Sequence, residues 1–268
     1  MNAIQIFLVL LLCVITYPFV IAFDAAGRAW RIKKVYAVDV TDEQLRRERR
    51  NSYFTTPIHP VTLAAAMLAG VLHVAPETWL GAGLTFIATF VWTEVYHYLL
   101  HRAIHLRSLH FIHREHHRSH ITNTWTSISF SFYEEFFFAI GVIGGLSLVS
   151  QWLPVSMYGI VAYYLLYFFT NTLGHSNLEV NAPGYMDTLL GKIFTTSAYH
   201  AMHHARYVKN YGLLTRIMDR LFDSEWADTN EVQSRAARGE PLTALRQKFG
   251  SEAVGDGAVG AQSSRLAS

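Results

Sequence analysis

The stretch EVYHYLLHRAIH, residues Glu94–His105, ends a membrane-length apolar run with histidines at regular helical spacing. Two further histidine motifs follow it, HREHH at His113–His117 and HAMHH at His200–His204, and His175 stands alone between them. Neutral imidazole is the commonest metal ligand in proteins, and it favours iron, zinc, copper or nickel. Because residues three and four apart share one helix face, we expect each motif to present its imidazoles in one direction. The sequence therefore predicts a histidine metal site beside apolar helices.

The number of histidines indicates how many metal ions to expect. Roughly eight to ten converging imidazoles are too many for one tetrahedral zinc ion. The only cysteine, Cys13, lies in an apolar run, so a thiolate metal site is excluded. We therefore expect two metal ions, held by the eight histidines of the three motifs, with the isolated His175 as a further candidate; the eight are His101, His105, His113, His116, His117, His200, His203 and His204.

Composition places these histidines in a membrane protein. Of the 268 residues, 51% are hydrophobic and 16% are charged, whereas soluble proteins average about 25% charged residues. The formal net charge of +2 is too small to indicate nucleic-acid binding, and the basic residues are not concentrated in a single stretch. No nucleic-acid partner is therefore expected.

Five apolar runs are candidates for membrane-crossing helices. Crossing the bilayer core needs about 20 apolar residues, with a range of about 17 to 25, and the second run falls short of that length. A secretory signal peptide is the competing interpretation of the first run, but no basic side chain precedes it. We expect an all-α, polytopic membrane bundle of about four to five apolar segments with a histidine-rich cytosolic cap; the runs are Ile4–Phe23, Val61–Val74, Trp79–Leu99, Phe136–Leu153 and Val155–Leu173.

The basic residues predict the orientation of this bundle. All 22 Lys and Arg fall within Arg28–Arg50, Arg102–Arg118 and Lys192–Arg265. Under the positive-inside rule these regions are cytoplasmic, and every histidine motif adjoins that side. We therefore expect an integral protein of the plasma or inner membrane, or of the endoplasmic reticulum, whose histidines and C-terminus face the cytoplasm. The opposite side then holds the segments without Lys or Arg, Met1–Ala3, Ala75–Thr78 and Gln151–Pro154.

Three regions follow from these patterns. Residues 1–56 are predicted to hold an N-terminal transmembrane helix and a basic cytosolic linker, residues 57–226 the metal-binding membrane domain, and residues 227–268 a polar, disordered tail. Within the linker, Thr41-Asp-Glu-Gln44 has the capping-box pattern at the head of a helix. Apolar side chains at helical spacing across Tyr211–Phe222 predict a further helix on the membrane surface or on the cap.

In these histidine motifs and their spacing, the chain resembles the sterol desaturase / fatty acid hydroxylase superfamily. Glu94–His105 is similar to the first histidine box of that family, Leu109–His120 to the second and Tyr199–His204 to the third. Asn210–Phe222 resembles the signature that follows the third box, and the isolated His175-Ser-Asn resembles the segment that supplies a further ligand. Four ordered motifs with matching spacing therefore carry the resemblance.

The resemblance covers roughly Thr55–Trp226 and implies an enzyme. Members of the family are integral-membrane proteins whose histidines hold two metal ions, usually iron, and they use dioxygen to hydroxylate, desaturate or otherwise oxidise lipids and sterols. The implied cofactors are two non-haem iron ions, with dioxygen as co-substrate. The implied substrate is a membrane lipid, whether a sterol or isoprenoid, a fatty acyl chain or an amino-lipid. No fused cytochrome b5 domain is recognisable, so the expected electron donor is a separate ferredoxin- or cytochrome b5-type protein with its reductase.

Three polar residues near the boxes are candidates for supporting roles behind the ligands. Glu94 falls on the same helix face as His101, where a carboxylate can orient a ligating imidazole; the alternative is pairing with a nearby basic group. His97 lies one turn before His101 on that face. Asn171 stands where some members of the family carry a second histidine, and it could hold a metal-bound water or contribute nothing.

Two other classes of function stay open on the sequence alone. A polytopic metal transporter would place its ligands near the bilayer midplane on facing helices, whereas these histidines flank the cytosolic side. A zinc-dependent membrane hydrolase would use a His-Glu-x-x-His helix or three ligands with a carboxylate base, and Glu115 is the acid inside a histidine motif. Of the other histidines, His110 and His120 are expected in polar surface or supporting positions, and His59 and His73 in structural or interfacial ones.

Overall fold

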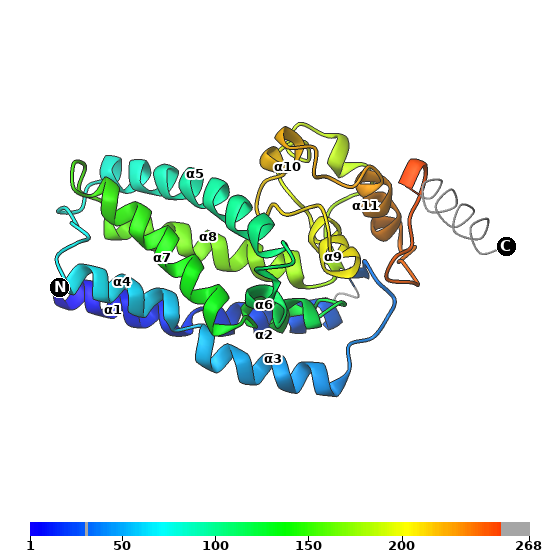
Figure 1. Ribbon diagram of the computed structural model, residues 1–268, viewed down its shortest axis with the longest axis horizontal. Helices are drawn as coiled ribbons and strands as arrows, with labels where there is room; N and C mark the ends of the chain where they lie inside the picture. Colours follow the sequence, from blue (N-terminus) through cyan, green and yellow to red (C-terminus); the bar gives the residue numbers. More distant parts are fainter. Residues whose placement is uncertain (30–31, 253–268) are drawn as a thin grey trace.

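The computed structural model describes residues 1–29 and 32–252, and these residues are mostly helical (Figure 1). Long helices lie side by side in a bundle, and short helices and loops form a cap at one end of it. Two short antiparallel strands, β1 and β2, pair Lys33 with Glu179 and Lys34 with Leu178. The elements are α1 (Ala3–Val14), α2 (Thr16–Ala29), β1 (Lys33–Lys34), α3 (Asp42–Thr55), α4 (Ile58–Leu68), α5 (Trp79–Ile104), α6 (His110–His113), η1 (His116–Arg118), η2 (Thr124–Ile128), α7 (Phe132–Val149), α8 (Met157–His175), β2 (Leu178–Glu179), η3 (Tyr185–Asp187), α9 (Ser197–Arg206), α10 (Ile217–Leu221) and α11 (Thr229–Arg238).

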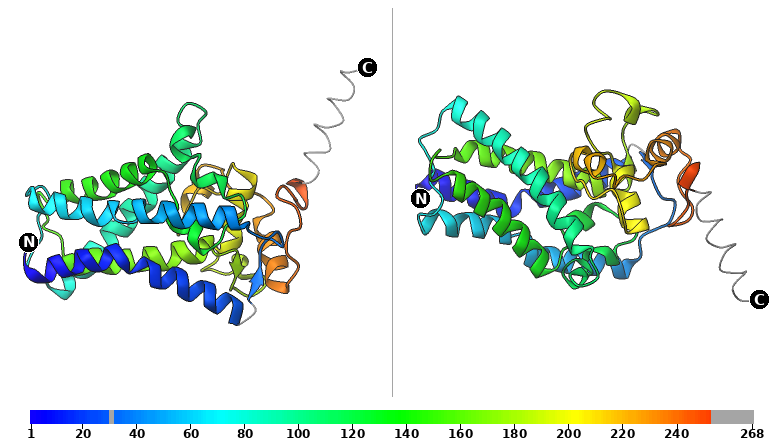
Figure 2. Two further views of the ribbon diagram at one scale, coloured as in Figure 1. Left: turned by 90° about the horizontal axis from the view of Figure 1, so that it is seen from below. Right: turned by 45° about the horizontal axis from the view of Figure 1, so that its top comes forward.

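The bundle consists of helices that run between the two ends of the molecule. α1 and α2 lead toward the cap, α3 and α4 lead away from it, and α5 returns; α7 leads away again and α8 returns (Figures 1 and 2). α5 packs against α7 and α8, and α4 packs against α7. Leu63, Ile143, Ile160 and Tyr163 are buried in the core between these helices. The connections from α4 to α5 and from α7 to α8 therefore lie at the end opposite the cap.

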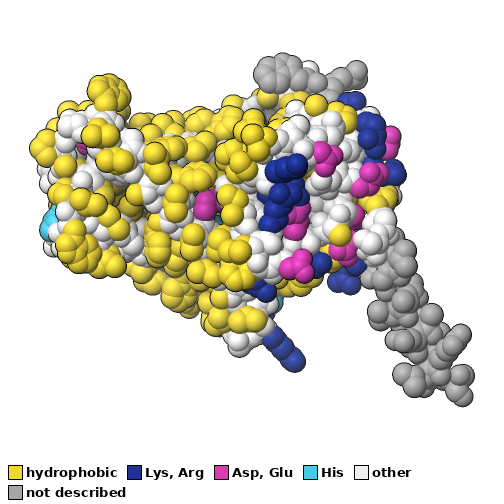
Figure 3. Space-filling view, turned by 90° about the horizontal axis from the view of Figure 1, so that it is seen from above, with side chains coloured by type: hydrophobic (Ala, Val, Ile, Leu, Met, Phe, Trp, Pro, Cys, Tyr) yellow, Lys and Arg dark blue, Asp and Glu magenta, His cyan; other side chains and the backbone are white. Residues whose placement is uncertain are grey.

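The outer surface of the bundle is apolar, while charged side chains gather at the cap end of the face shown in Figure 3. Phe7, Leu84 and Ile87 are between 59% and 62% exposed. Extended apolar surface on a single chain marks contact with a membrane or with another protein. Two helical stretches, Ala3–Ala29 and Phe132–Val149, are long and apolar enough to cross a membrane. These features together indicate membrane association.

α5 differs from those two stretches because it carries a polar stripe. Thr85, Thr89, Thr93, His97 and His101 follow one another at intervals of four residues, and all five are buried. Intervals of four keep side chains on one helix face, so this face of α5 is directed into the bundle. The polar stripe lowers the hydropathy of α5. Helix length and hydropathy therefore support two crossings directly, and the expected four to five crossings rest on the sequence pattern.

The cap has a small core of its own, to which the C-terminal region contributes. α11 packs against α9 and buries Val232 and Ala236, which lie one helical turn apart. The prediction that residues 227–268 are disordered is therefore wrong for Thr229–Arg238, because this polar segment has one apolar face that the cap covers. The last part of the predicted tail, residues 253–268, lies outside the described residues.

The helix predicted over Tyr211–Phe222 is much shorter in the structure. α10 spans only Ile217–Leu221. The main-chain amides of Tyr211 and Gly212 donate to the Asp219 carboxylate, at 3.0 and 2.6 Å, so these residues form an irregular loop in place of the first helical turns. That loop lies against the histidines, because the Tyr211 ring is 5.8 Å from the ring of His101.

Candidate metal centre

Where the bundle meets the cap, the nine predicted histidines come together in two groups. The candidate ligand atoms within each group lie within 4.8 Å of one another, and all the side chains are buried except His105, which is partly buried. Two groups of this kind could each hold a metal ion. The five-histidine group consists of His101, His105, His113, His117 and His203, and the four-histidine group consists of His116, His175, His200 and His204.

The second and third histidine motifs divide between the two groups, so the expectation that each motif presents a single face is wrong. On α9, His200 and His204 belong to the four-histidine group, whereas His203 belongs to the five-histidine group. Residues four apart differ by about 40° around a helix axis and residues three apart by about 60° in the other direction. His116 and His117 likewise enter different groups. Each of these motifs therefore ties the two sites together.

Main-chain carbonyls orient five of the imidazoles. Their Nδ1 atoms lie 2.7–3.0 Å from a carbonyl oxygen, which can only accept, so each Nδ1 carries a proton and donates it. Nε2 is then the unprotonated nitrogen of each ring and is left for a metal ion. The carbonyls belong to Tyr211 for His101, Ser129 for His116, Asn171 for His175, Lys209 for His203 and Ser119 for His204.

The backbone conformation of the loop after α9 places two of these carbonyls beside the imidazoles. Lys209 and Asn210 have φ angles of 66° and 53°, in the left-handed region, and asparagine tolerates that conformation better than most residues. The Asn210 amide then donates to a main-chain carbonyl of α9 at 3.1 Å. Gly212 has no space for a side chain, because a Cβ there would lie 2.2 Å from the Thr215 carbonyl oxygen. These constraints hold the Lys209 and Tyr211 carbonyls against the histidines.

A carboxylate orients a sixth imidazole. Nδ1 of His113 lies 2.7 Å from Oε1 of Glu134, and both side chains are almost fully buried. Such a carboxylate fixes the tautomer of a ligating imidazole and raises its basicity. The sequence had indicated Glu94 for this role, but Glu94 accepts instead from the amide and hydroxyl of Thr215, at 2.7 and 2.6 Å. The signal for Glu134 was the pair Glu134–Glu135 at the start of an otherwise apolar helix.

The other two predicted supporting residues, His97 and Asn171, both lie beside the ligands. The His97 ring stacks on Phe138 at 5.1 Å and lies 5.0 Å from the ring of His101. The Asn171 side chain donates to a carbonyl of η2 at 2.7 Å, whereas its main-chain carbonyl accepts from His175. The asparagine side chain therefore acts on His175 only by fixing this part of α8.

Unprotonated nitrogens face each other inside both groups. The Nε2 atoms of His101 and His113 are 3.0 Å apart, and those of His116 and His175 are 3.3 Å apart. In all four rings Nδ1 already holds the proton, so two lone pairs meet in each pair with no hydrogen between them. This arrangement is repulsive unless a cation shares the lone pairs. The residues present therefore fit a metal ion in each group.

Burial keeps these imidazoles neutral. Desolvation, followed by the influence of neighbouring imidazoles, lowers the pKa of His117, His200 and His204 well below its usual value. Both ring nitrogens of His105 and Nε2 of His204 have no hydrogen-bond partner among the described residues, which is costly for a buried polar group. No carboxylate from the described ranges belongs to either group. A metal ion bound by such neutral ligands would keep its full positive charge.

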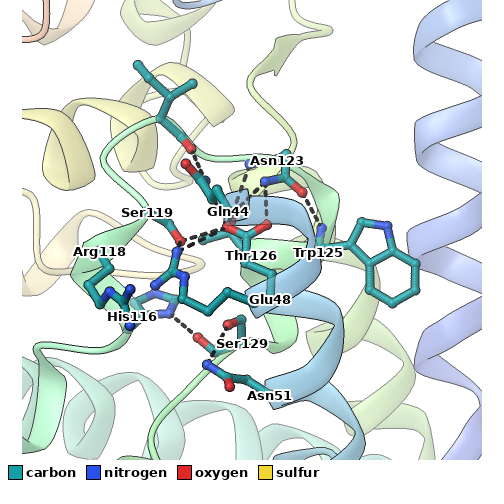
Figure 4. A network of polar contacts seen from close by, with 12 residues as sticks. Gln44, Glu48, Asn51, His116, Arg118, Ser119, Asn123, Trp125, Thr126 and Ser129 are labelled. Atoms are coloured by element: carbon teal, nitrogen blue, oxygen red, sulfur yellow. Dashed lines mark hydrogen bonds and ion pairs between the residues drawn. The ribbon is translucent and has the colours of Figure 1, made fainter. Parts of the chain in front are cut away.

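A buried polar network on α3 supports the loop beneath the four-histidine group (Figure 4). Glu48 accepts from the Ser119 hydroxyl and from the Asn123 amide, each at 2.6 Å. Arg47 donates to the same Ser119 oxygen at 2.7 Å, so the buried charges are paired and hydrogen-bonded. Because the Ser119 carbonyl orients His204, α3 positions the centre without contributing a ligand.

A small cavity adjoins the centre on the side of the bundle. Its volume is about 20 Å³, enough for about one water molecule. The Phe130 ring, which lines it, stacks on His116 at 4.6 Å. Tyr167 lines this cavity and two others of similar size that continue toward His59. The cavity brings histidines of both groups together with His97, Phe130, Glu134, Phe138, Tyr167, Asn171 and Leu213.

The remaining histidines lie outside both groups. Nδ1 of His59 is 2.8 Å from Oε1 of Glu135, and His110 contacts the Tyr207 hydroxyl. His73 and His120 are exposed. Together with His97, they are the five histidines that the sequence analysis did not include among the nine predicted ligands.

Comparisons with known proteins point to one family. The family model described as "Fatty acid hydroxylase" matches residues 86–224, slightly more than half of the chain. The very-long-chain aldehyde decarbonylase GL1-4 of Oryza sativa subsp. indica is 28% identical over 171 residues, which are 61% of this chain and 27% of that protein. Protein CER1-like 1 of Arabidopsis thaliana is 26% identical over 209 residues, 76% of this chain and 33% of that protein. The fatty acid hydroxylase vlmA of Lecanicillium sp is 31% identical over 178 residues, 60% of this chain and 47% of that protein.

The matches cover between about a quarter and a half of the length of these relatives. No solved structure matches the chain. Residues 86–224, which the family model matches, include all nine histidines of the two groups. The chain therefore belongs to the fatty acid hydroxylase family.

Proposed function

We propose that the protein is a membrane-bound di-iron oxygenase that uses dioxygen and external electrons to hydroxylate or desaturate a lipid. The observation that carries this proposal is the convergence of nine imidazoles in groups of five and four, with facing Nε2 lone pairs in each. Nitrogen ligands of this kind suit iron, copper and zinc. We choose iron among these metals because the resemblance of the histidine motifs to those of this family implies it.

The residues around the centre have separate tasks in this reaction. The bound iron ions would supply the activation of dioxygen and the removal of hydrogen from an unactivated C–H bond. Five main-chain carbonyls and Glu134 hold the imidazole rings in fixed orientations. Burial of both groups excludes bulk water from the reacting atoms. The cavity beside Phe130, Phe138 and Tyr167 is where one carbon of the substrate is held within reach of the oxidant.

A long apolar chain is the substrate that this setting favours. The apolar exterior of the bundle (Figure 3) allows a lipid to approach from the bilayer, and aromatic rings surround the cavity at the centre. Two relatives carry the names very-long-chain aldehyde decarbonylase and fatty acid hydroxylase. We therefore place fatty acyl chains first among the substrates, ahead of sterols, other isoprenoids and amino-lipids.

We also propose that the bundle crosses the plasma or inner membrane, or that of the endoplasmic reticulum, four to five times with the cap in the cytoplasm. All 22 Lys and Arg belong to segments that the topology assigns to one side. A ferredoxin- or cytochrome b5-type donor with its reductase would then reach the cap from the cytoplasm. The side of the membrane on which the cap lies thus decides which electron donors are available.

The two other classes of function have less support. A zinc hydrolase needs a carboxylate base at the metal, and Glu115 instead pairs with Arg47 and Arg118, at 3.3 and 3.1 Å. A metal transporter needs ligands near the middle of its helices, whereas both histidine groups lie at the cap end of the bundle.

Lipid analysis under labelled dioxygen tests the proposal. Lipids from cells that express the wild-type protein, His203→Ala protein or no protein are compared by mass spectrometry. Hydroxylation should appear as a labelled hydroxyl on one lipid class, and desaturation as the loss of two hydrogens without label, in wild-type cells only. The purified protein should hold two irons per chain after anaerobic loading. Identical lipids in all three samples, or full turnover with zinc alone, would overturn the proposed function.

A further inference from the structure

A cavity of about 590 Å³ lies at the boundary between the bundle and the cap, and the proposed reaction does not use it. Its volume is within the range of small-molecule binding sites, about 300–1,000 Å³. It lies between the C-terminal end of α2, the start of α3, and the segments 122–125 and 176–178. None of its lining residues belongs to either histidine group. It is therefore a second site, distinct from the metal centre.

Three cations and one acid line this cavity. Arg28, Lys34 and Arg49 each contribute a positive charge, and Asp24 contributes a negative one. Arg28 pairs with Asp24, and Lys34 lies 3.0 Å from Asp39. The side chains of these two ion pairs are between 43% and 87% exposed, and exposed ion pairs contribute little to stability. An anionic ligand can therefore replace either acid at little cost.

Arg49 is the most available of the three cations. Its guanidinium lies over the Trp125 ring, 5.0 Å from the centroid, and none of the ion pairs found within residues 1–29 and 32–252 includes Arg49. Figure 4 shows the Trp125 indole directed away from the Glu48 network. Stacking holds the guanidinium plane but leaves its N–H groups free to donate, which is the geometry that arginine uses to bind phosphate and carboxylate.

The remaining lining suits the first methylenes of an aliphatic chain. Five aliphatic side chains contribute to it, together with Asp24, Gly27 and Arg28 from the last turns of α2. The helical stretch that ends there, Ala3–Ala29, is long and apolar enough to cross a membrane. A ligand in this cavity therefore meets cations and aliphatic side chains together, at the level where a membrane helix ends. The five are Ile32, Val38, Val40, Leu45 and Leu178.

Two buried hydroxyls in the lining lack partners. Thr122 and Thr124 are 1% and 3% exposed, and neither hydroxyl has a hydrogen-bond partner within the described part of the chain. Because these hydroxyl oxygens have almost no accessible surface, a ligand in the cavity meets the cations and the aliphatic side chains and not these hydroxyls.

We propose that this cavity binds the anionic headgroup of a membrane amphiphile, with a phosphate or carboxylate at the cations and the start of its chain against the aliphatic side chains. Occupation of the cavity also bears on the metal centre. Asn123 lines the cavity and donates to Glu48, which in turn accepts from Ser119. The Ser119 carbonyl orients His204, so a bound headgroup braces the loop that positions this imidazole.

Native mass spectrometry of the purified full-length protein tests the proposal. The probes are phosphatidylglycerol, phosphatidylcholine with the same acyl chains, and inorganic phosphate. Phosphatidylglycerol should be retained at least about tenfold more strongly than phosphatidylcholine, because hydrogen bonds to charged groups contribute about 1.5–3 kcal/mol. Equal retention of the two lipids would overturn the proposal, and inorganic phosphate that binds as tightly as phosphatidylglycerol would overturn the assignment of a lipid.

Matched variants locate the binding. Arg49→Gln should lower retention of phosphatidylglycerol about tenfold, whereas Arg50→Gln, which removes the same charge from the next residue of α3 but not from the cavity, should leave it unchanged. Lys34→Gln removes a second, exposed cation from the lining and should also weaken retention while preserving the thermal midpoint. Equal retention by the Arg49 and Arg50 variants, or wild-type retention by Arg49→Gln and Lys34→Gln, would overturn the proposed site. These measurements need no turnover, so they stand or fall separately from the oxygenase proposal.

Discussion

Replacing Glu134 by glutamine tests a carboxylate that orients a candidate metal ligand, the only such carboxylate within the described residues. Its Oε1 lies 2.7 Å from Nδ1 of His113, and the two side chains are 1% and 2% exposed. Hydrogen bonds to charged groups contribute about 1.5–3 kcal/mol and are about twice as strong as neutral ones. Glutamine keeps an acceptor oxygen but loses the charge, so about 1–1.5 kcal/mol should be lost from metal binding at the five-histidine group. That loss corresponds to about a tenfold lower affinity, within the range of about 10–100-fold for residues that support metal ligands.

The next residue supplies the matched control. Oε1 of Glu135 lies 2.8 Å from Nδ1 of His59, and His59 belongs to neither histidine group. Glu135→Gln should therefore keep the wild-type metal affinity. The assay is anaerobic competition with a chelator, followed by metal analysis of the protein. The thermal midpoint is measured in parallel, because the buried glutamine NH₂ replaces the unpartnered Oε2 of Glu134 and costs about 1–3 kcal/mol of stability. Wild-type metal affinity in folded Glu134→Gln protein would refute the supporting role of this carboxylate.

Three further predictions follow from the centre and the topology. His175→Ala should abolish turnover and lower bound metal from two toward one per chain, while His120→Ala, at an exposed position, should change neither; full metal content and activity in the first variant would remove His175 from the ligands. Because burial lowers the pKa of His117, His200 and His204, protons compete with the metal only well below the ordinary histidine pKa of about 6.5. Metal analysis after dialysis at a series of pH values should therefore find metal retained at about pH 5.5 and lost as the pH falls further, and a release midpoint at about 6.5 would contradict this. A reporter fused after Trp226 should be cytoplasmic and one placed in the Ala75–Thr78 turn external; the reverse pattern would overturn the orientation.

The nine histidines were predictable because a metal ligand must be a particular type of residue at a particular spacing. Their division into five and four was not, since His116 and His117 are neighbours in the sequence and enter different groups. That division depends on how the chain turns from α6 into η1. The spacing of the histidines therefore indicated which of them would come together, but not which of the two groups each would join.

Residues that act through tertiary contacts were harder to predict. Glu94 was predicted to support His101, but its carboxylate binds Thr215, 121 positions further along the chain. Glu134 binds His113 instead, from a helix that the sequence marked only as apolar. α11 was taken as part of a disordered tail because its composition is polar, although its single apolar face is covered by the cap. In each case the deciding contact joins segments that are distant in the sequence.

The orientation of five imidazoles by main-chain carbonyls has a consequence for how such proteins change over time. A carbonyl is present whatever the side chain, so no single substitution at Ser119, Ser129 or Lys209 deletes the acceptor that its residue provides. Glu134 is the exception, because its acceptor is a side chain. A scan of single substitutions should thus find the histidines and Glu134 intolerant, while the loops that aim the rings tolerate exchange as long as their backbone shape survives. The orientation of these imidazole rings therefore depends mainly on the backbone conformation of the loops. Substitutions that change only the side chains of those loops should alter it little.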